Sequence, residues 1–541
     1  MNSRYLLLPA ALLLSGLTGC AGIPADWGRS DVVQMASDRG RQMPEVADIQ
    51  TFTDKSLRQP LTSDTAVQLA LLNNPEVRNQ TAKLGFAAAE RYDAARLANP
   101  TFSLTRLSGD SSAGGNMPLL TLGIALDFTN LLFLPANKRF AEAEFEAAKL
   151  EVAAATLDLA AEVEQAWLEA VGAEQMAQMR EAAAKAQQAS ASLAQRFFDA
   201  GNINALELST ERAAASQAVL AAISARAEAV TARSALNRLM GLSAAQSQWT
   251  LEARLPELPA GDETPEDLQT LALNSRLDVA SLRERAEAIA GRFNLTRKTR
   301  WINGIEVGAE RERDFDGAVD AGPTLSLELP LFNWGGGRVA AIHAAMEQAE
   351  AELDQRVLEV SNDVQLTTAK LAATRELAEE YRLTLIPAVD AVVKQSQLEQ
   401  NYMLIGVFEL ILAKQQAYEA YAGYLESVRD YWIARSELSR VVGRDLPRSS
   451  TTTGNTLAPE QFLKPKGDGM DHSQHSMGGM PGMDHSMHGA MPSGDGKSKP
   501  MPQGHAGHSM KDKRGVSGKS ESMSPSTSQS PDASPMHQHQ H

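Results

Sequence analysis

The chain has 541 residues, a formal net charge of −16 and a pI near 5.2. This acidic balance argues against a nucleic-acid partner. Aromatic residues make up 5% of the chain, which suits long alanine-rich helices better than a large globular core. No nucleophile–base pair, phosphate-binding loop or pair of catalytic carboxylates stands out, so we do not expect an enzyme.

The first 19 residues have the features of a lipoprotein signal peptide. Arg4 supplies the positive charge, Tyr5–Leu14 is a short apolar segment, and Leu17–Cys20 resembles a bacterial lipobox. Cys20 is the only cysteine in the chain, so we expect it to carry a covalent lipid. No aspartate follows it to indicate retention at the inner membrane. The alternative is a plain secretory signal with an incidental cysteine.

Residues 20–61 show weak periodicity and are predicted to form an extended arm after the lipid anchor. A helical pattern begins at Ser63–Asp64, a fair N-cap, and runs to about Leu97. Pro75 predicts a break within it.

Two stretches predict very long helices. Lys138–Ala200 contains no proline, and its apolar residues recur at steps of three, four and seven. At 1.5 Å per residue it makes a rod of roughly 90–95 Å, too long for an ordinary domain. A second rod is predicted over Val339–Leu404, with a kink at Pro387.

The two rods belong to an internal duplication. Residues 232–241 and 434–443 are identical at six of ten positions, at an offset of 202 residues. Residues 69–77 match 271–279 at the same offset. A constant offset at both ends of a long span indicates a repeat, because chance similarity between alanine-rich helices would not keep register across loops.

Four short segments alternate between apolar and polar residues. This period of two over 7–10 residues is typical of transmembrane barrel strands. The alternative for any one segment is a sheet half-buried in a soluble domain, but the chain offers no other sheet to pack against. Four strands cannot close a barrel, and lipid does not tolerate an open edge, so other protomers must complete it. The predicted strands are Thr101–Leu107, Leu120–Phe128, Ile305–Arg311 and Thr324–Leu331.

This order of elements resembles the outer-membrane efflux factor family, the TolC-like proteins, over about Thr62–Gly443. The first repeat departs from the family pattern, with Leu126-Asp127-Phe128 where a Pro-Leu-Phe segment is expected. Residues 401–410 look most like the heavy-metal branch, which includes CusC-like copper and silver exporters. The other residues that carry the resemblance are Ala66-Val67 through Asn73-Asn74-Pro75, Leu329–Arg338, and the two Arg-x-x-Gly endings, Arg238–Gly241 and Arg440–Gly443.

The resemblance implies a mainly α fold with a small β part. Three protomers would form a twelve-stranded barrel in the outer membrane of a Gram-negative bacterium, on an α-helical tunnel that crosses the periplasm. The implied partners are a periplasmic adaptor protein and an inner-membrane pump of the RND type.

Turns between helices at the far ends of the rods are predicted near Gly201-Asn202 and Gly406. Just beyond them lie Glu207 and Glu409, again 202 residues apart. The resemblance puts this region at the periplasmic mouth, where rings of like charge favour cations. The alternative is an ordinary solvated glutamate on a helix surface.

The domain boundaries follow from these patterns. Trp249, Leu251, Leu255 and Leu258 indicate that the linker between the repeats packs as a belt. After about Ser449 no hydrophobic period survives, which predicts a disordered tail. We therefore divide the chain into signal peptide 1–19, arm 20–61, repeat 62–242, belt 243–263, repeat 264–448 and tail 449–541.

The tail is rich in potential metal ligands. Nine of the ten histidines and ten of the nineteen methionines lie between Met470 and His541. Thioether and imidazole ligands suit Cu(I) or Ag(I). The alternative is that this composition arose by drift in a low-complexity segment and has no role in metal binding. His343, alone on the second rod, is predicted to be a surface residue. The candidate ligands are Met470, His472, His475, Met477, Met480, Met483, His485, Met487, His488, Met491, His505, His508 and Met510.

These observations favour an outer-membrane channel of a tripartite efflux system that exports copper, silver or other heavy-metal ions, with no required cofactor. One alternative is an efflux factor for drugs or other organic substrates with a metal-buffering tail. A second is a periplasmic copper-sequestering lipoprotein without a channel.

Overall fold

The computed structural model describes residues 23–43, 48–108, 118–252, 254–259 and 267–446. Helices dominate, and one antiparallel sheet has the strand order β1-β2-β3-β4. Each half of the described chain contributes two short helices, two strands and a long helical hairpin in the same order. This recurrence supports the duplication inferred from the offset of 202 residues.

The arm is not extended, contrary to the sequence prediction. It contains helices α2 (Arg29–Ser37) and α3 (Ile49–Ser56). Val32 and Ala36 of α2 are buried, and α2 packs against the long helix α6. A nine-residue helix is marginal alone, so this packing holds it in place.

The first repeat opens with α4 (Ser63–Asn73) and α5 (Pro75–Ala94). The predicted break at Pro75 is confirmed, because Asn74 caps α5 and Pro75 takes its first position, where a missing N–H costs nothing. Thr62, rather than Ser63 or Asp64, caps α4 by accepting a hydrogen bond from the Thr65 N–H.

The strands are β1 (Thr101–Leu107), β2 (Leu119–Asp127), β3 (Ile305–Arg313) and β4 (Val319–Leu327). The prediction is confirmed for β1 and close for β2 and β3. It is wrong for β4, which begins five residues earlier and ends four residues earlier than predicted. Phe128 is also not part of β2, because it begins the next helix.

Helix α6 (Phe128–Asp199) contains 72 residues and is followed by α7 (Ala205–Leu239). It begins ten residues before the predicted start, because the Asp127 carboxylate caps it by accepting from the Asn130 N–H. Pro135 lies inside this early part of the helix. At 1.5 Å per residue α6 is about 108 Å long.

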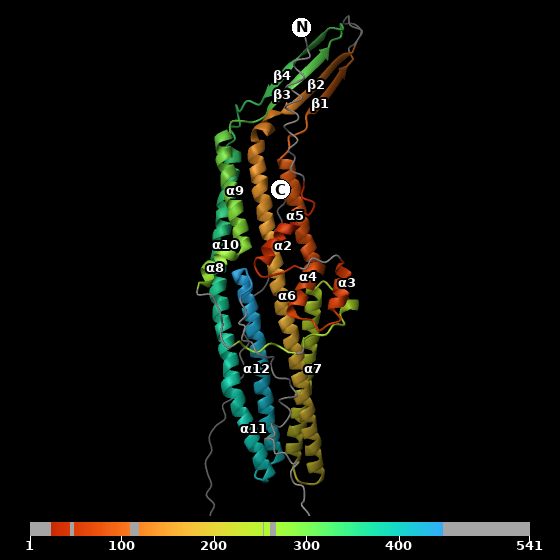
Figure 1. Cartoon of the computed structure of the whole chain (residues 1–541), viewed down its shortest axis with the longest axis vertical. Coiled ribbons are helices and arrows are strands. Elements are labelled where there is room, and N and C mark those ends of the chain that lie inside the picture. The colour runs from red at the N-terminus through yellow and green to blue at the C-terminus, as the bar shows by residue number, and fades with distance from the viewer. Residues whose placement is uncertain (1–22, 44–47, 109–117, 253, 260–266, 447–541) are drawn as a thin grey trace, which may run out of the picture. The chain divides into compact units, whose positions relative to one another are not determined.

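The second repeat comprises α8 (Leu268–Ser275), α9 (Leu277–Thr299), α10 (Gly336–Glu380), α11 (Ile386–Asn401) and α12 (Val407–Val442). A five-residue π-helical segment, η4 (Tyr381–Leu385), joins α10 to α11 directly before Pro387. The kink predicted at Pro387 stays a prediction, and what the structure shows is a change in backbone hydrogen bonding that ends two residues before it. In Figure 1, α12 runs beside α11 and α10.

The segment that links the repeats packs as expected. Trp249, Leu255 and Leu258 are buried in the main hydrophobic core with α4, α6 and α12. The Leu255 N–H donates to Gln175 of α6, and the Trp432 indole of α12 donates to the Pro256 carbonyl. The short 3₁₀ helix η3 (Ala244–Gln246) starts this segment.

Each repeat closes through the same contact. The Asn74 side chain donates to the Leu239 carbonyl at 2.8 Å in the first repeat. In the second, 202 residues later, the Arg276 side chain donates to the Val441 carbonyl at 3.0 Å. Gly241 and Gly443 follow these carbonyls with φ of 67° and 78°. The last helix of each repeat, α7 or α12, therefore ends against the junction between the two short helices of that repeat. These junctions are α4–α5 and α8–α9.

Candidate functional site

The sheet has one apolar face. The register places Phe102, Ile124, Ala309 and Pro323 side by side across the four strands. Since residues two apart share a face, the rest of this face follows from the register. It carries Leu104, Leu120, Leu122, Leu126, Ile305, Val307, Val319, Ala321, Leu325 and Leu327, and the three strand arginines, Arg106, Arg311 and Arg313.

The opposite face is polar and acidic. It carries all five acids of the strands, and Thr121 there donates to Glu312 at 3.2 Å. An apolar face of this kind suits a hydrocarbon environment, whereas the polar face suits water and favours cations. The sequence alternation alone did not show that all five strand acids lie on one face of the sheet and all three strand arginines on the other. That separation depends on the register between the strands. The five acids are Asp127, Glu306, Glu310, Glu312 and Asp320.

The first predicted turn between helices lies between α6 and α7. Gly201 has φ 75°, and its N–H bonds to the Phe198 carbonyl at 2.9 Å. The Asn204 side chain caps α7 by accepting from the Glu207 N–H, and its amide donates back to the Glu207 carboxylate, both at 3.0 Å. Glu207 is exposed, so it presents its charge to solvent beside the Asn204 cap.

The second turn lies between α11 and α12. Met403 adopts φ 58° there, an uncommon conformation for a residue other than glycine. Gly406 precedes α12, and a Cβ on it would lie 2.5 Å from Oε2 of Glu409. Glu409 is therefore folded back over the start of the helix, and it is also exposed.

The structure brings the two turns together. The Phe197 ring, near the end of α6, packs edge-on against the Phe408 ring at the start of α12, with centroids 6.0 Å apart. Both turns lie at the same end of the helices (Figure 1). An acid stands in the first turn of each returning helix, where it complements the helix dipole.

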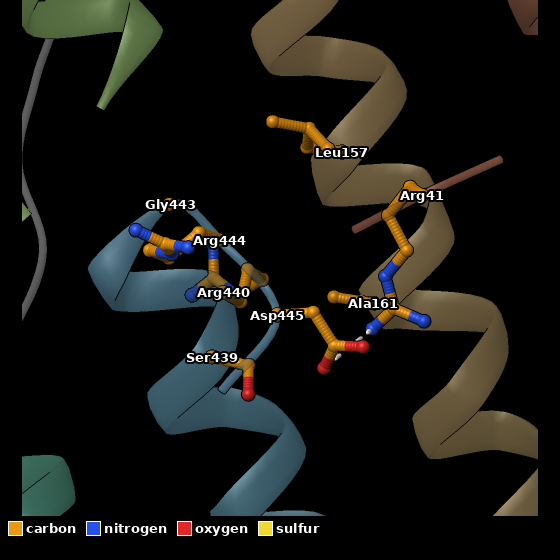
Figure 2. Close-up of a pocket in the computed structure, with 8 residues that line it drawn as sticks. All are labelled: Arg41, Leu157, Ala161, Ser439, Arg440, Gly443, Arg444 and Asp445. Carbon is orange, nitrogen blue, oxygen red and sulfur yellow. Dashed lines mark ion pairs between the residues drawn. The ribbon is translucent and has the colours of Figure 1, made fainter. Parts of the chain in front are cut away.

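A buried ion pair ties the arm to α6, close to the end of α12, and sequence reasoning missed it. Arg41 is 9% exposed and contacts Glu164 of α6 at 2.5 Å. Figure 2 shows Arg41 reaching towards Asp445 beyond the end of α12, at 3.9 Å. Burial alone would lower the pKa of Arg41, but the carboxylates of Glu164 and Asp445 outweigh it and raise that pKa. The sequence offered no signal, because Arg41 lies in a weakly patterned segment.

Several predicted residues lie outside the described residues. These are Cys20 and every candidate metal ligand of the tail from Met470 to Met510. Within the described ranges, no group of three or more His, Cys, Asp or Glu side chains is placed to hold a metal ion. His343 is exposed on α10 and packs against Phe293, as expected of a surface residue.

Comparison with known proteins finds a family match for the first repeat and a relative for most of the chain. The profile of the family described as outer membrane efflux protein matches residues 66–242. The chain is 23% identical over 399 residues to the cobalt-zinc-cadmium resistance protein CzcC of Cupriavidus metallidurans, covering 71% of this chain and 90% of that one. The comparison thus relates residues 66–242 of the chain to the outer membrane efflux protein family.

Solved structures share the fold of this chain. The Campylobacter jejuni CmeC outer membrane channel superimposes with a TM-score of 0.62 at 14% identity, over 76% of this chain and 91% of that one. CusC, solved in work on folding and transmembrane channel formation, gives 0.60 at 16% identity, over 71% and 92%. Among the described residues, no helix combines the length and the apolar character needed to cross a bilayer.

Proposed function

We propose that this chain is the outer-membrane channel of a tripartite system that exports heavy-metal ions. Three copies would join their sheets into a twelve-stranded barrel and their long hairpins into a periplasmic tunnel. The tunnel would receive ions from an adaptor protein and an inner-membrane pump of the RND type. The chain would act by conduction and not by catalysis.

The separation of charge on the sheet carries this proposal. A sheet with fourteen apolar residues and three arginines on one face and five acids on the other fits a wall between lipid and an aqueous pore. In one chain β1 and β4 each pair on one side only. Lipid cannot solvate those free backbone groups, so a membrane-embedded form requires neighbouring copies.

The choice of metal ions over organic substrates rests on the chain's likeness to CzcC and on its tail. CzcC is named for resistance to cobalt, zinc and cadmium, whereas the methionine-rich tail favours copper or silver. A deletion strain grown on Cu, Ag, Zn, Co and Cd and on a drug panel tests the choice. Sensitivity to drugs alone would favour the organic-substrate alternative. Absence of conductance in planar bilayers would favour a sequestering lipoprotein without a channel.

We predict that the tail acts as a weak, reversible metal ligand and not as part of the pore. A chain truncated after Arg448 is expected to assemble and conduct normally but to tolerate less copper or silver. A peptide of residues 466–541 should compete for Cu(I) with a chromophoric chelator, because it carries many thioether and imidazole groups. Unchanged metal tolerance together with no binding by the peptide would remove copper and silver from the proposal.

We predict that Cys20 is lipidated and anchors the arm. Metabolic labelling with a radioactive fatty acid should mark the wild type and leave Cys20→Ala unlabelled. Because the proposed barrel holds the protein in the membrane anyway, the variant is expected to retain part of its export activity. Equal labelling of both proteins would show that the lipid is not attached there.

We predict that Glu409, and by repeat symmetry Glu207, line the periplasmic entrance. Glu409→Lys should lower cation conductance and cation selectivity in planar bilayers, because three positive charges replace three negative ones at the mouth. Its effect on stability should be small, since an exposed charge at a helix start contributes about 0.3–1 kcal/mol. Glu228→Lys, an exposed acid farther along α7, is the matched control. Equal selectivity of the two variants would contradict the assignment.

A further inference from the structure

The elements next to the sheet lack acids over long stretches. Residues 128–141, 288–305 and 329–346 contain no aspartate or glutamate. With 67 acids in 541 residues, about six would be expected in 50 residues of average composition. The same stretches contain seven basic residues, namely Lys138, Arg139, Arg292, Arg297, Lys298, Arg300 and Arg338.

These three stretches meet in space. The Arg292 guanidinium lies over the Phe140 ring at 4.5 Å, which joins α9 to α6. Arg338 at the start of α10 donates to the Arg300 carbonyl at 2.9 Å and to Asn303 at 2.8 Å. Thr129 of α6 donates to the Asn303 carbonyl at 3.1 Å. The junction between helices and sheet therefore gathers seven basic side chains, against three acids at the sheet ends, Asp127, Glu306 and Glu328.

The basic side chains are not neutralised within the protein. Among the described residues, none of the seven forms an ion pair with a carboxylate. Lys138, Arg139, Arg297 and Lys298 are exposed. Their charge therefore remains available to an anionic partner.

Exposed apolar side chains lie beside this charge. Trp301 and Trp334 pack edge-on with ring centroids 5.0 Å apart, yet they remain 42% and 56% exposed. Leu329, Leu331 and Phe332 follow β4 and are 67%, 68% and 99% exposed. Leu329 and Leu331 continue the sequence alternation of Leu325 and Leu327 beyond the end of β4.

We propose that this junction binds the anionic phospholipid headgroups of the membrane leaflet nearest the helices. Tryptophan prefers the boundary between hydrocarbon and headgroups, and basic side chains beside it attract anionic lipids. Leu329, Leu331 and Phe332 enter the acyl layer, the tryptophan pair lies at its edge, and the basic side chains contact phosphates. The inference rests on the proposed location in the outer membrane and deepens it by naming the lipid chemistry that the junction recognises.

The position of the tryptophan pair is tested by fluorescence quenching. The full chain is reconstituted into nanodiscs that contain phospholipids brominated on their acyl chains. We expect the double variant Trp301→Phe/Trp334→Phe to lose most of the quenching seen in the wild type. Trp27→Phe should keep it, because Trp27 is also 44% exposed but packs against Gly85 of α5. Quenching that the double variant leaves unchanged would overturn the proposal.

The role of the basic residues is tested by lipid-dependent stability in detergent. Phosphatidylglycerol should raise the melting temperature of the wild type more than phosphatidylcholine does, and high salt should reduce that excess. Lys138→Gln/Arg297→Gln/Lys298→Gln should lose at least about half of the excess. The control triple Lys185→Gln/Arg196→Gln/Arg226→Gln makes the same charge change on exposed positions of α6 and α7 and should keep it. Equal losses in both would mean a general charge effect and overturn the proposal.

The two proposals fail in different ways. A protein that conducts in planar bilayers, but shows neither quenching by brominated lipid nor extra stabilisation by phosphatidylglycerol, contradicts the headgroup inference alone. A protein that shows both the quenching and the extra stabilisation but does not conduct contradicts the channel function alone. If a second copy covers the junction instead of lipid, the tryptophan pair is not quenched, and the headgroup inference fails.

Discussion

Ile124→Arg is expected to abolish most assembly in the outer membrane. Ile124 is at the middle of β2 on the apolar face, between Phe102 and Ala309, and is 52% exposed in the single chain. Placing a lipid-facing arginine near the bilayer midplane costs about 2–4 kcal/mol, which corresponds to roughly a 30- to 900-fold loss in an equilibrium constant. Each protomer of a trimer would bear this cost. The yield of heat-sensitive trimer from outer membranes is the measurement.

Thr324→Arg is the matched control for this experiment. Thr324 directly follows Pro323, which is in register with Ile124 through Ala309, but it lies on the polar face. The arginine there would face water at the same depth, so assembly should be close to that of the wild type. If both variants assemble normally, or both fail equally, the assignment of the faces to lipid and water is wrong.

Gly241→Ala should strongly destabilise the helical part of the protein. Gly241 has φ 67°, and a Cβ on it would lie 2.7 Å from both the carbon and the oxygen of the Asn73 carbonyl. The left-handed conformation costs an alanine roughly 1–2 kcal/mol, and forced overlap in a packed region adds about 1–3 kcal/mol. Backbone cannot swing aside as a long side chain can. We expect a lower thermal midpoint by circular dichroism in detergent and a lower yield of folded protein.

Gly201→Ala separates these two costs. Gly201 has φ 75°, but no atom lies within 4 Å of where its Cβ would be. It should therefore bear only the conformational cost of roughly 1–2 kcal/mol. A midpoint for Gly241→Ala no lower than that of Gly201→Ala would show that the close contact between α7 and the α4–α5 junction does not limit stability.

The sequence predicted the repeats, the rods and the alternating strands because each depends on a local period. β4 shows where this reasoning ends. Leu325 and Leu327 belong to the strand, but the same alternation continues through Leu329 and Leu331, which do not. The register is set instead by the hairpin, where Arg313 pairs with Val319 across a turn with Gly317 at φ 89°. Alternation shows which residues share a face but not where pairing stops.

The arm and the ion pair could not be predicted for a different reason. Helix α2 owes its stability to α6, more than 100 residues later in the chain, and Arg41 meets Glu164 and Asp445 only in the folded protein. A signal for α3 was present, since Asp48 caps it through the Gln50 and Thr51 N–H groups. The two glutamates at the turns were identified correctly as equivalent positions, but their function depends on the assembly.

The π-helical segment η4 makes the two repeats mechanically unequal. In the first repeat the outgoing rod is one continuous helix, α6, whereas in the second it is interrupted at Tyr381–Leu385. Gly423 of α12 leaves room for the Tyr381 ring, and the Tyr421 hydroxyl donates to Asp390 of α11 at 2.9 Å just beyond the interruption. In a ring of three chains, three hairpins with a continuous outgoing helix would therefore alternate with three hairpins whose outgoing helix is interrupted by η4. Such a ring would have three-fold rather than six-fold symmetry in its backbone hydrogen bonding, and bending would be expected first at its three π-helical segments.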